Sequence, residues 1–308
     1  MITILLAAYN GEKYISDQID SLLSQTVQDF RLHICDDKST DETFAIATEY
    51  AKKHPGKIFA AQNEENTGAA KLNFIKMMTE HRDDYMMLCD QDDIWLPDKI
   101  KTTLAKMQEL ETRHGTETPL LVHTDLRVVD EKLDTISPSF KLAMNADYKK
   151  TRLRNQVIQN TLTGCTAMYN RALAELITET PPYMVEHDWW LMLVASAFGK
   201  IDTVYEQTIL YRQHDRNQIG AKDVRTLKYK INKLLKYEEV KKAIDITYLQ
   251  AQSLIDVFKN KLSSEQNKLL VEYCDVPNHI KPVRWIKIVN LGVLKNGFSR
   301  KIAHFIFV

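Results

Sequence analysis

The sequence predicts an α/β fold in which a mainly parallel sheet is flanked by helices and followed by a C-terminal helical extension. Two observations predict it. In the first half of the chain, short apolar runs alternate with segments whose apolar residues recur at helical spacing. Three of these runs end in polar clusters, as strands do at the ligand-binding edge of an open α/β sheet. The 308 residues suffice for one large core and a smaller appendage.

The apolar runs predict strands at Ile2–Ala8, Phe30–Cys35, Ile58–Gln62, Tyr85–Cys89 and Leu120–Asp125. Helical spacing predicts helices between them, at Tyr14–Gln25, Ser39–Lys53, Ala69–Met78 and Asp98–Arg113. The sequence Ser39-Thr40-Asp41-Glu42 has the pattern of a capping box at the start of the second helix. This strand–helix order is typical of a mainly parallel sheet with helices on both faces.

After Leu126 the alternation stops. The later elements are expected as a polar loop over the site at Lys132–Asn155, a strand at Thr163–Tyr169, a helix at Asp188–Phe198 and one or two short strands within Ile201–Gln213. Beyond Ala221 the pattern is helical. We therefore expect two domains, an α/β domain at residues 1–220 and a helical extension at residues 221–308.

The net charge is zero but unevenly distributed, because residues 222–308 hold 17 Lys and Arg against 8 Asp and Glu. We expect no nucleic-acid partner. The four cysteines include no Cys-x-x-Cys pair, which favours reduced residues of a cytoplasmic protein over a disulfide framework. The apolar run Ile2–Ala8 lacks a basic leader, so we interpret it as a strand rather than a signal peptide.

Polar clusters follow the first, second and fourth predicted strands. These clusters are Ala8-Tyr9-Asn10-Gly11, Asp36-Asp37-Lys38-Ser39 and Asp90-Gln91-Asp92-Asp93. Asp90 and Asp92 lie two residues apart at a strand end, and a carboxylate pair of this kind suits Mg²⁺ or Mn²⁺. Simpler interpretations remain open, since Asp36 or Asp37 could cap a helix and the later cluster could be an acidic loop before one.

Four motifs in order resemble the inverting family 2 glycosyltransferases, which have the GT-A fold. They are Ala7-Ala8-Tyr9-Asn10-Gly11, Asp36-Asp37-Lys38-Ser39-Thr40-Asp41, Asn66-Thr67-Gly68 and Asp90-Gln91-Asp92-Asp93-Ile94-Trp95. The last motif, with three later ones, resembles the rhamnosyltransferase branch that builds Gram-positive cell-wall rhamnose polysaccharides. The later motifs are His123-Thr124-Asp125-Leu126, His187-Asp188-Trp189-Trp190 and Tyr211-Arg212-Gln213-His214.

The resemblance implies a role for each matching residue. Asp92 would hold a divalent metal, Asp90 would contact the metal or the ribose, and His214 would contact the metal or the diphosphate. Asp188 would be the general base, although His187 stands where the family has Glu. The other residues implied to bind the nucleotide or donor are Ala8, Tyr9, Asn10, Asp36, Asp37, Asn66, Gly68, Lys71, Gln91 and Gly164. An acceptor or sugar platform would come from Trp95, Trp189, Trp190 and His187.

For several of these residues a structural role remains open. Asp188 could cap its helix, Gly164 could mark a bulge, and His214 could be structural. At least one of Trp189 and Trp190 is expected in the core.

The resemblance also implies the partners, which are dTDP-β-L-rhamnose as donor and a saccharide acceptor anchored to a polyprenyl lipid. Such an acceptor would bring the protein to the inner face of the membrane. Basic residues alternate with apolar ones from Lys222 to Lys236, and again from Arg284 to Leu291, as in helices that lie on anionic lipid. The alternative is that these helices pack on the catalytic domain or on a second subunit.

Other protein classes fit less well. A nucleotidyltransferase usually begins with a Gly-rich loop containing Arg, which Ala7-Ala8-Tyr9-Asn10-Gly11 is not. A phosphoacceptor signalling domain needs a lysine after its fifth strand, and Leu120–Asp125 does not supply one. A non-catalytic sugar-binding copy would lack the metal ligands or the base, whereas Asp90, Asp92 and Asp188 are all present.

Overall fold

The computed structural model describes residues 1–214 and 237–308, which belong to two compact units. Unit 1 contains Met1–Phe140, Leu162–Thr180 and the chain from Gly199 to His214. Unit 2 contains Lys141–Thr161, Pro181–Phe198 and the described chain from Tyr237 to Val308. Two segments of the predicted first domain therefore group with the C-terminal helices. The expected boundary near Gly220 and the basic stretch from Lys222 to Lys236 lie outside the described residues.

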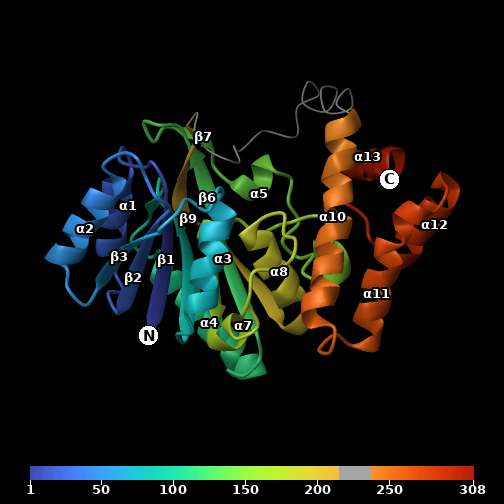
Figure 1. Cartoon of the computed structure of the whole chain (residues 1–308), viewed down its shortest axis with the longest axis horizontal. Coiled ribbons are helices and arrows are strands. Elements are labelled where there is room, and N and C mark those ends of the chain that lie inside the picture. Colours follow the sequence, from blue (N-terminus) through green and yellow to red (C-terminus); the bar gives the residue numbers. More distant parts are fainter. Residues whose placement is uncertain (215–236) are drawn as a thin grey trace. The chain divides into compact units, whose positions relative to one another are not determined.

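Unit 1 is built on one mixed sheet with the order β3-β2-β1-β4-β8-β6-β9-β5, and β7 pairs with β6 (Figure 1). The strands are β1 (Ile2–Ala8), β2 (Phe30–Asp36), β3 (Ile58–Gln62), β4 (Tyr85–Asp90), β5 (Ile94–Trp95), β6 (Leu120–Val129), β7 (Thr135–Ser137), β8 (Ala167–Asn170) and β9 (Lys200–Arg212). Because β8 is antiparallel to both β4 and β6, and β9 is parallel to β6, six of these strands point the same way.

The helices of unit 1 cover this sheet. They are α1 (Ile15–Leu23), α2 (Thr43–Lys53), α3 (Ala70–Glu80), α4 (Lys99–His114), the short α7 (Arg171–Ala174) and the 3₁₀ turn η1 (Gly164–Thr166). α3 packs on β1, and α4 packs on β6, β8 and β9. Every residue of β1 is buried, since the strand lies between β2 and β4 and is covered on its faces. Its apolar composition is that of a strand buried on both faces.

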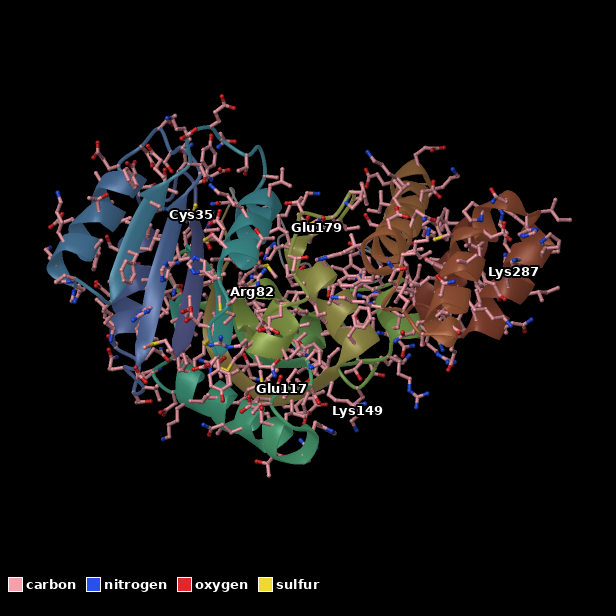
Figure 2. The ribbon with its side chains drawn as sticks, turned by 60° about the horizontal axis from the view of Figure 1, so that its bottom comes forward. Cys35, Arg82, Glu117, Lys149, Glu179 and Lys287 are labelled. Atoms are coloured by element: carbon pink, nitrogen blue, oxygen red, sulfur yellow. The ribbon has the colours of Figure 1, made fainter. Side chains whose placement is uncertain are left out.

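Hydrogen bonds from one arginine connect the end of α3 to the later segment of unit 1. Arg82, labelled in Figure 2, donates to the carbonyls of Met78 and His81 at 2.6 Å each, and also to the carbonyl of Ile177. Arg82 is half-buried, and its guanidinium group would be costly without such acceptors. The bond to Ile177 ties the segment Leu162–Thr180 to the end of α3 although the two are distant in sequence.

The predicted α/β fold is confirmed, with local corrections. α2 begins at Thr43 rather than Ser39, and the expected capping box is absent, because the Ser39 hydroxyl bonds the Asp36 carboxylate instead. The strand expected at Thr163–Tyr169 begins only at Ala167, after η1. The strand β5 was not expected. The segment Lys132–Asn155 contains β7 and the short helices α5 (Phe140–Ala143) and α6 (Leu153–Gln156) as well as loop.

Unit 2 is helical among its described residues. Its main elements are α8 (His187–Phe198), α10 (Tyr237–Phe258), α11 (Ser264–Cys274), the turn η2 (Val276–Asn278), α12 (Lys281–Leu291) and α13 (Phe298–Phe307). The ring of Phe258 packs on Trp190 and Phe198 of α8, with ring centroids 6.3 and 4.8 Å away. The predicted C-terminal helical extension is therefore present. None of the helices described here is long and apolar enough to cross a membrane.

Candidate active site

The polar clusters after β1, β2 and β4 meet at one edge of the sheet of unit 1. Ala8 pairs with Asp36 in the β1–β2 register, and Ala7 pairs with Asp90 in the β1–β4 register. The Asp37 N–H donates to the carbonyl of Ala8 at 2.8 Å. The three sequence clusters thus form one surface at the carboxyl ends of parallel strands, where open α/β sheets bind ligands.

Asp36 and Asp37 are buried and hold the loops of this edge. The Asp36 carboxylate accepts from the Ser39 N–H at 2.9 Å and from the Gln62 amide at 2.8 Å. The Asp37 carboxylate accepts from the Asn63 amide, and from the N–H and hydroxyl of Thr67, at 2.7–2.9 Å. Neither residue caps α2, whose N-cap residue is Glu42. Their predicted contact with the nucleotide stays a prediction, while their positioning role is visible.

A buried polar network that the sequence did not indicate lies beneath Asp37. The Asn63 side chain accepts from Lys76 Nζ at 2.6 Å, and its amide also faces the Asn73 carbonyl oxygen at 3.2 Å. Asn73 in turn donates to the backbone oxygen of Cys35, which is labelled in Figure 2 at the end of β2. Because buried polar groups need partners, this network fixes the position of the loop. Apolar patterns in the sequence do not reveal this network, because Asn63 and Asn73 are polar.

The Asn66 side chain closes the loop Asn66-Thr67-Gly68. Asn66 donates to the Asp37 carbonyl at 2.6 Å and accepts from the Gly68 N–H at 2.8 Å. Gly68 has φ +86°, a conformation that favours glycine. Lys71 follows in the first turn of α3 and is half-buried. Asn66 and Gly68 therefore lie close to Asp37, at the edge of the sheet. Their contact with a donor, like that of Lys71, stays a prediction.

The Gln91 side chain connects the loop after β4 to the loop after β1. Its side-chain oxygen accepts from the Tyr9 N–H at 2.8 Å, and its amide donates to the Tyr9 carbonyl at 2.9 Å. A Cβ at Gly11 would lie 2.2 Å from the same Gln91 oxygen, so only glycine leaves room for this contact. Gln91 was predicted to bind the donor, whereas its side chain here fixes the backbone of Tyr9.

Tyr9 and Asn10 differ in exposure and role. The Asn10 side chain accepts from the Thr40 N–H at 2.8 Å, and its φ of +47° makes the sharp turn after β1. Tyr9 is 47% exposed, next to the edge made by Ala8 and Asp37. An exposed aromatic ring beside a pre-formed loop can stack on a nucleobase. Asn10 and Ala8 instead determine the path of the backbone after β1.

Asp92 lies beside His214 at the end of β9. Asp92 Oδ2 is 2.8 Å from His214 Nε2, and both side chains are mostly buried. The His214 ring stacks on Tyr14, with the ring centroids 4.8 Å apart. Asp92 and His214 are thus together, as the predicted metal site requires.

Arg212, which was not singled out from the sequence, holds the acidic loop in place. Its Nε donates to the Asp92 carbonyl at 3.0 Å, and its backbone N–H donates to Asp93 Oδ1 at 3.1 Å. Its terminal nitrogen pairs with Asp17 Oδ2 at 3.0 Å. The burial of Arg212 and these contacts show that β9 positions the loop after β4. The signal in the sequence was the polar run that begins at Arg212 directly after an apolar strand.

A second cluster contains Asp90, Asp93 and Cys165, whose ligand atoms lie within 4.8 Å of one another. Burial raises the pKa of Asp93 and of the Cys165 thiol well above their usual values, so both groups favour the protonated form. A protonated thiol is a poor ligand for Mg²⁺ or Mn²⁺. Asp92, beside His214, and Asp90 remain the predicted ligands. Carboxylate oxygens of this kind suit a hard divalent cation.

Trp95 does not form a sugar platform. It is 2% exposed because β5 pairs with β9, and Lys99 Nζ lies 4.4 Å from its ring centroid. Burial lowers the pKa of Lys99 to about 8, even with Asp93 and the Cys165 thiol nearby. The platform prediction for Trp95 is therefore wrong in this structure. Trp95 is instead a core residue that directly follows the acidic loop Asp90–Asp93. Gly164 begins η1 and is likewise buried.

The remaining predicted residues lie in unit 2. Asp188 lies in the first turn of α8, is half-buried, and accepts from the Asn160 amide at 3.1 Å. Trp190 is 1% exposed and packs on Phe258, so the platform prediction for Trp190 is wrong and its core role is correct. Trp189 is half-buried and donates to the Gln156 carbonyl at 2.6 Å. Burial lowers the pKa of His187 to about 3, which keeps it neutral and makes it unsuited to the surface of a sugar platform.

The mixed sheet has acidic loops and an exposed tyrosine at the carboxyl ends of its parallel strands, the edge where open α/β sheets bind ligands, and this architecture fits the GT-A fold. Residues 3–177 match Glycosyl transferase family 2. Because the match spans more than half of the chain, the protein belongs to this family and is a glycosyltransferase.

Two similar proteins whose names state an activity agree with this class. The chain is 27% identical over 241 residues to the dTDP-rhamnosyl transferase RfbG of Shigella flexneri, covering 73% of this chain and 77% of that protein. It is 28% identical over 216 residues to the chondroitin synthase of Escherichia coli, covering 70% of this chain but only 29% of that longer protein.

Solved structures confirm the fold. TarS 1-349 of S. aureus in complex with UDP-GlcNAc aligns with a TM-score of 0.56 at 15% identity, covering 94% of this chain and 88% of that one. The mannosyltransferase PcManGT of Pyrobaculum calidifontis, in complex with GDP-Man and Mn²⁺, aligns with a TM-score of 0.54 at 13% identity, covering 94% and 73%. At such identities the likeness concerns architecture alone.

Proposed function

We propose that the chain transfers L-rhamnose from dTDP-β-L-rhamnose to a saccharide hydroxyl of a polyprenyl-linked cell-wall polysaccharide precursor, inverting the anomeric configuration. The observation that carries the donor is the 27% identity to a dTDP-rhamnosyl transferase over most of both chains. The motifs at Asp90–Trp95 and His187–Trp190 support it, since they resemble the rhamnosyltransferase branch. The reaction would take place in the cytoplasm, at the inner face of the membrane.

The edge of unit 1 would bind the donor. The exposed ring of Tyr9 would stack on the pyrimidine, on a loop that Gln91 and Asp37 hold rigid. Asp92 and Asp90, with His214, would hold Mg²⁺ or Mn²⁺. When bound, such an ion would neutralise the charge that develops on the departing diphosphate. Arg212 would keep Asp92 in place through its bond to the Asp92 carbonyl.

Asp188 is proposed as the general base. It would take the proton from the acceptor hydroxyl while that oxygen bonds to the anomeric carbon and the bond from that carbon to the diphosphate oxygen breaks. Its place in the first turn of α8 favours the ionised carboxylate that a base requires, because the helix dipole is positive there. The Asn160 amide, which donates to Asp188 Oδ1, would orient the carboxylate.

A donor panel tests the proposal. The purified chain is incubated with Mg²⁺ or Mn²⁺ and with dTDP-L-rhamnose, UDP-glucose, UDP-galactose or UDP-N-acetylglucosamine, and released nucleoside diphosphate is measured. We expect dTDP-L-rhamnose to be turned over fastest and chelator to abolish turnover. A clear preference for a UDP-sugar would refute rhamnose and leave the family assignment intact.

Two variants separate the metal site from the base. Asp92→Asn should largely remove donor binding, whereas Asp188→Asn should keep donor affinity and lower turnover by about 100-fold. Asp98→Asn serves as the control because Asp98 is an exposed carboxylate on the same segment as Asp92. Normal turnover in Asp188→Asn would make this residue a helix cap, and full activity of Asp92→Asn would contradict the metal assignment.

A further inference from the structure

The outer faces of α12 and α13 are apolar. On α12 the exposed side chains include Trp285, Ile286 and Val289, and on α13 Phe298, Ile302 and Ile306. Phe298 alone is 82% exposed. Residues 285, 286 and 289 share one side of α12, and residues 298, 302 and 306 one side of α13, because residues three or four apart lie on the same face of a helix. We call these six residues the apolar surface.

Arg284 and Lys287 lie on the other side of α12. Arg284 donates to the carbonyls of His279 and Pro277, the latter at 2.8 Å. Lys287, labelled in Figure 2, pairs with Asp275 at 2.9 Å. An ordinary amphipathic helix of a globular domain buries its apolar stripe and exposes its charges. α12 buries Ile288, yet it also exposes Trp285, Ile286 and Val289, so it has apolar residues on its outer side as well.

Two hydrogen bonds connect α12 to the end of α13. Trp285 Nε1 donates to the Phe305 carbonyl at 2.7 Å, and Lys281 Nζ donates to the Ile306 carbonyl at 3.2 Å. These bonds bring the N-terminal half of α12 to the C-terminal end of α13. The apolar surface therefore belongs to two connected helices, and exposed apolar patches mark interaction sites.

The net charge of this part of the chain indicates the partner. The range from Asp275 to Val308 contains six basic residues, Lys281, Arg284, Lys287, Lys295, Arg300 and Lys301, and one acidic residue, Asp275, which pairs with Lys287. Two copies of this region placed face to face would bring like charges together. An anionic lipid surface would accept both the apolar side chains and the positive charge. α12 and α13 are too short to span a bilayer, and both suit a position within its interface.

We propose that α12 and α13 dock unit 2 onto an anionic lipid bilayer, with Phe298, Ile302 and Ile306 entering the headgroup region. This inference rests on the exposure and charge of α12 and α13 and is independent of the donor. The proposed membrane contact is made by residues 281–307 and does not require the basic stretch from Lys222 to Lys236.

Vesicle co-sedimentation of the full chain tests the proposal. Vesicles of phosphatidylcholine alone are compared with vesicles that contain about a third of phosphatidylglycerol, at low and at high salt. We expect binding to the anionic vesicles only, weakened by salt. The variant Phe298→Ser/Ile302→Ser should lose at least ten-fold in partitioning. Leu249→Ser is the matched control, since Leu249 is an exposed apolar residue of α10 outside the apolar surface, and it should bind as the wild type does.

Three results would overturn the proposal. The intact chain could stay in the supernatant with anionic vesicles at low salt, or Phe298→Ser/Ile302→Ser could sediment like the wild type. The third is a dimer of the intact chain, by analytical ultracentrifugation, that this variant converts to a monomer without any vesicle binding, which would assign the surface to a second copy. Donor turnover with a water-soluble acceptor should be equal in wild type and variant, so failure here is distinct from failure of the proposed function.

Discussion

At the carboxyl edge of β1, β2 and β4, charged and amide side chains are buried, whereas on α12 and α13 tryptophan, isoleucine and phenylalanine side chains lie in solvent. Asp36, Asp37 and Asn63 are almost inaccessible, yet each has several hydrogen-bond partners. Phe298 and Ile286 are mostly exposed on the other unit. Both regions reverse the usual distribution of polar and apolar residues.

The two reversals have different energetic consequences. Buried polar groups must be matched by partners, so removing one member of the network at the sheet edge leaves others unsatisfied. Exposed apolar groups contribute little to folding, so removing them leaves the fold intact and affects only what binds there. The free energy of unfolding of variants can therefore distinguish the two regions. Substitutions in the buried network at the sheet edge should lower it, and substitutions at the apolar surface should not.

The largest expected effect on stability is at Asp37. Asp37→Ala removes the acceptor for the Asn63 amide and for the N–H and hydroxyl of Thr67, so we expect a loss of about 3 kcal/mol in the free energy of unfolding. Urea unfolding followed by circular dichroism measures it. Asp98→Ala is the control, because its carboxylate makes one hydrogen bond and one ion pair, both exposed, and should contribute no more than about 1 kcal/mol. Equal losses in both variants would contradict the positioning role of Asp37.

The next effect concerns the inner side of α13. Burial lowers the pKa of His304 from 6.5 to about 3. Between these values the unfolded chain binds a proton that the folded chain does not. Stability should therefore fall as the pH falls below 6.5, by about 1.4 kcal/mol per pH unit for this group.

The variant His304→Leu isolates this contribution from that of the other buried histidines. Its stability should fall less steeply than that of the wild type between pH 6.5 and 5, a difference of about 2 kcal/mol over that range. Thermal unfolding at several pH values provides the measurement. Parallel pH profiles for the two proteins would show that His304 is equally protonated in the folded and unfolded states, and that the inner side of α13 is open to water.

A smaller effect is expected at Gly11. Gly11→Ala would push the Gln91 side chain away from Tyr9 and remove two hydrogen bonds, which should cost about 1–2 kcal/mol. Gln91→Ala removes the same bonds and makes room for the added methyl group. The double variant should therefore cost no more than Gln91→Ala alone, as expected for residues in contact. Strictly additive losses would mean that Gly11 serves another purpose.

The strands could be predicted from sequence because burial on both faces demands long apolar runs. β1 and β3 match their predicted bounds, and β2 and β4 extend by one residue, to Asp36 and Asp90. That the clusters after these strands share one edge also followed from the prediction that the strands are parallel. The family came from four short motifs in the expected order, which the match over residues 3–177 confirms.

What sequence could not reveal is the direction in which polar and aromatic side chains point. Gln91 reaches Tyr9 across 82 positions, and Trp95 is covered because β5 pairs with a strand more than a hundred residues later. Local patterns contain no information about such partners. For α12 the periodicity defined an apolar face but could not say whether that face lies inside or outside, since this depends on how Arg284 and Lys287 are satisfied.

The smallest effect on stability is expected at the apolar surface, and it completes the comparison. Because Phe298 is 82% exposed, Phe298→Ser should change the free energy of unfolding by no more than about 0.5 kcal/mol. Phe307→Ser, at the buried side of the same helix, should cost several kilocalories per mole. Urea unfolding of both variants measures the difference. If Phe298→Ser destabilises the chain as strongly as Phe307→Ser, Phe298 is covered in solution by another part of the chain or by a second copy. The residue would then no longer be free to enter a lipid surface.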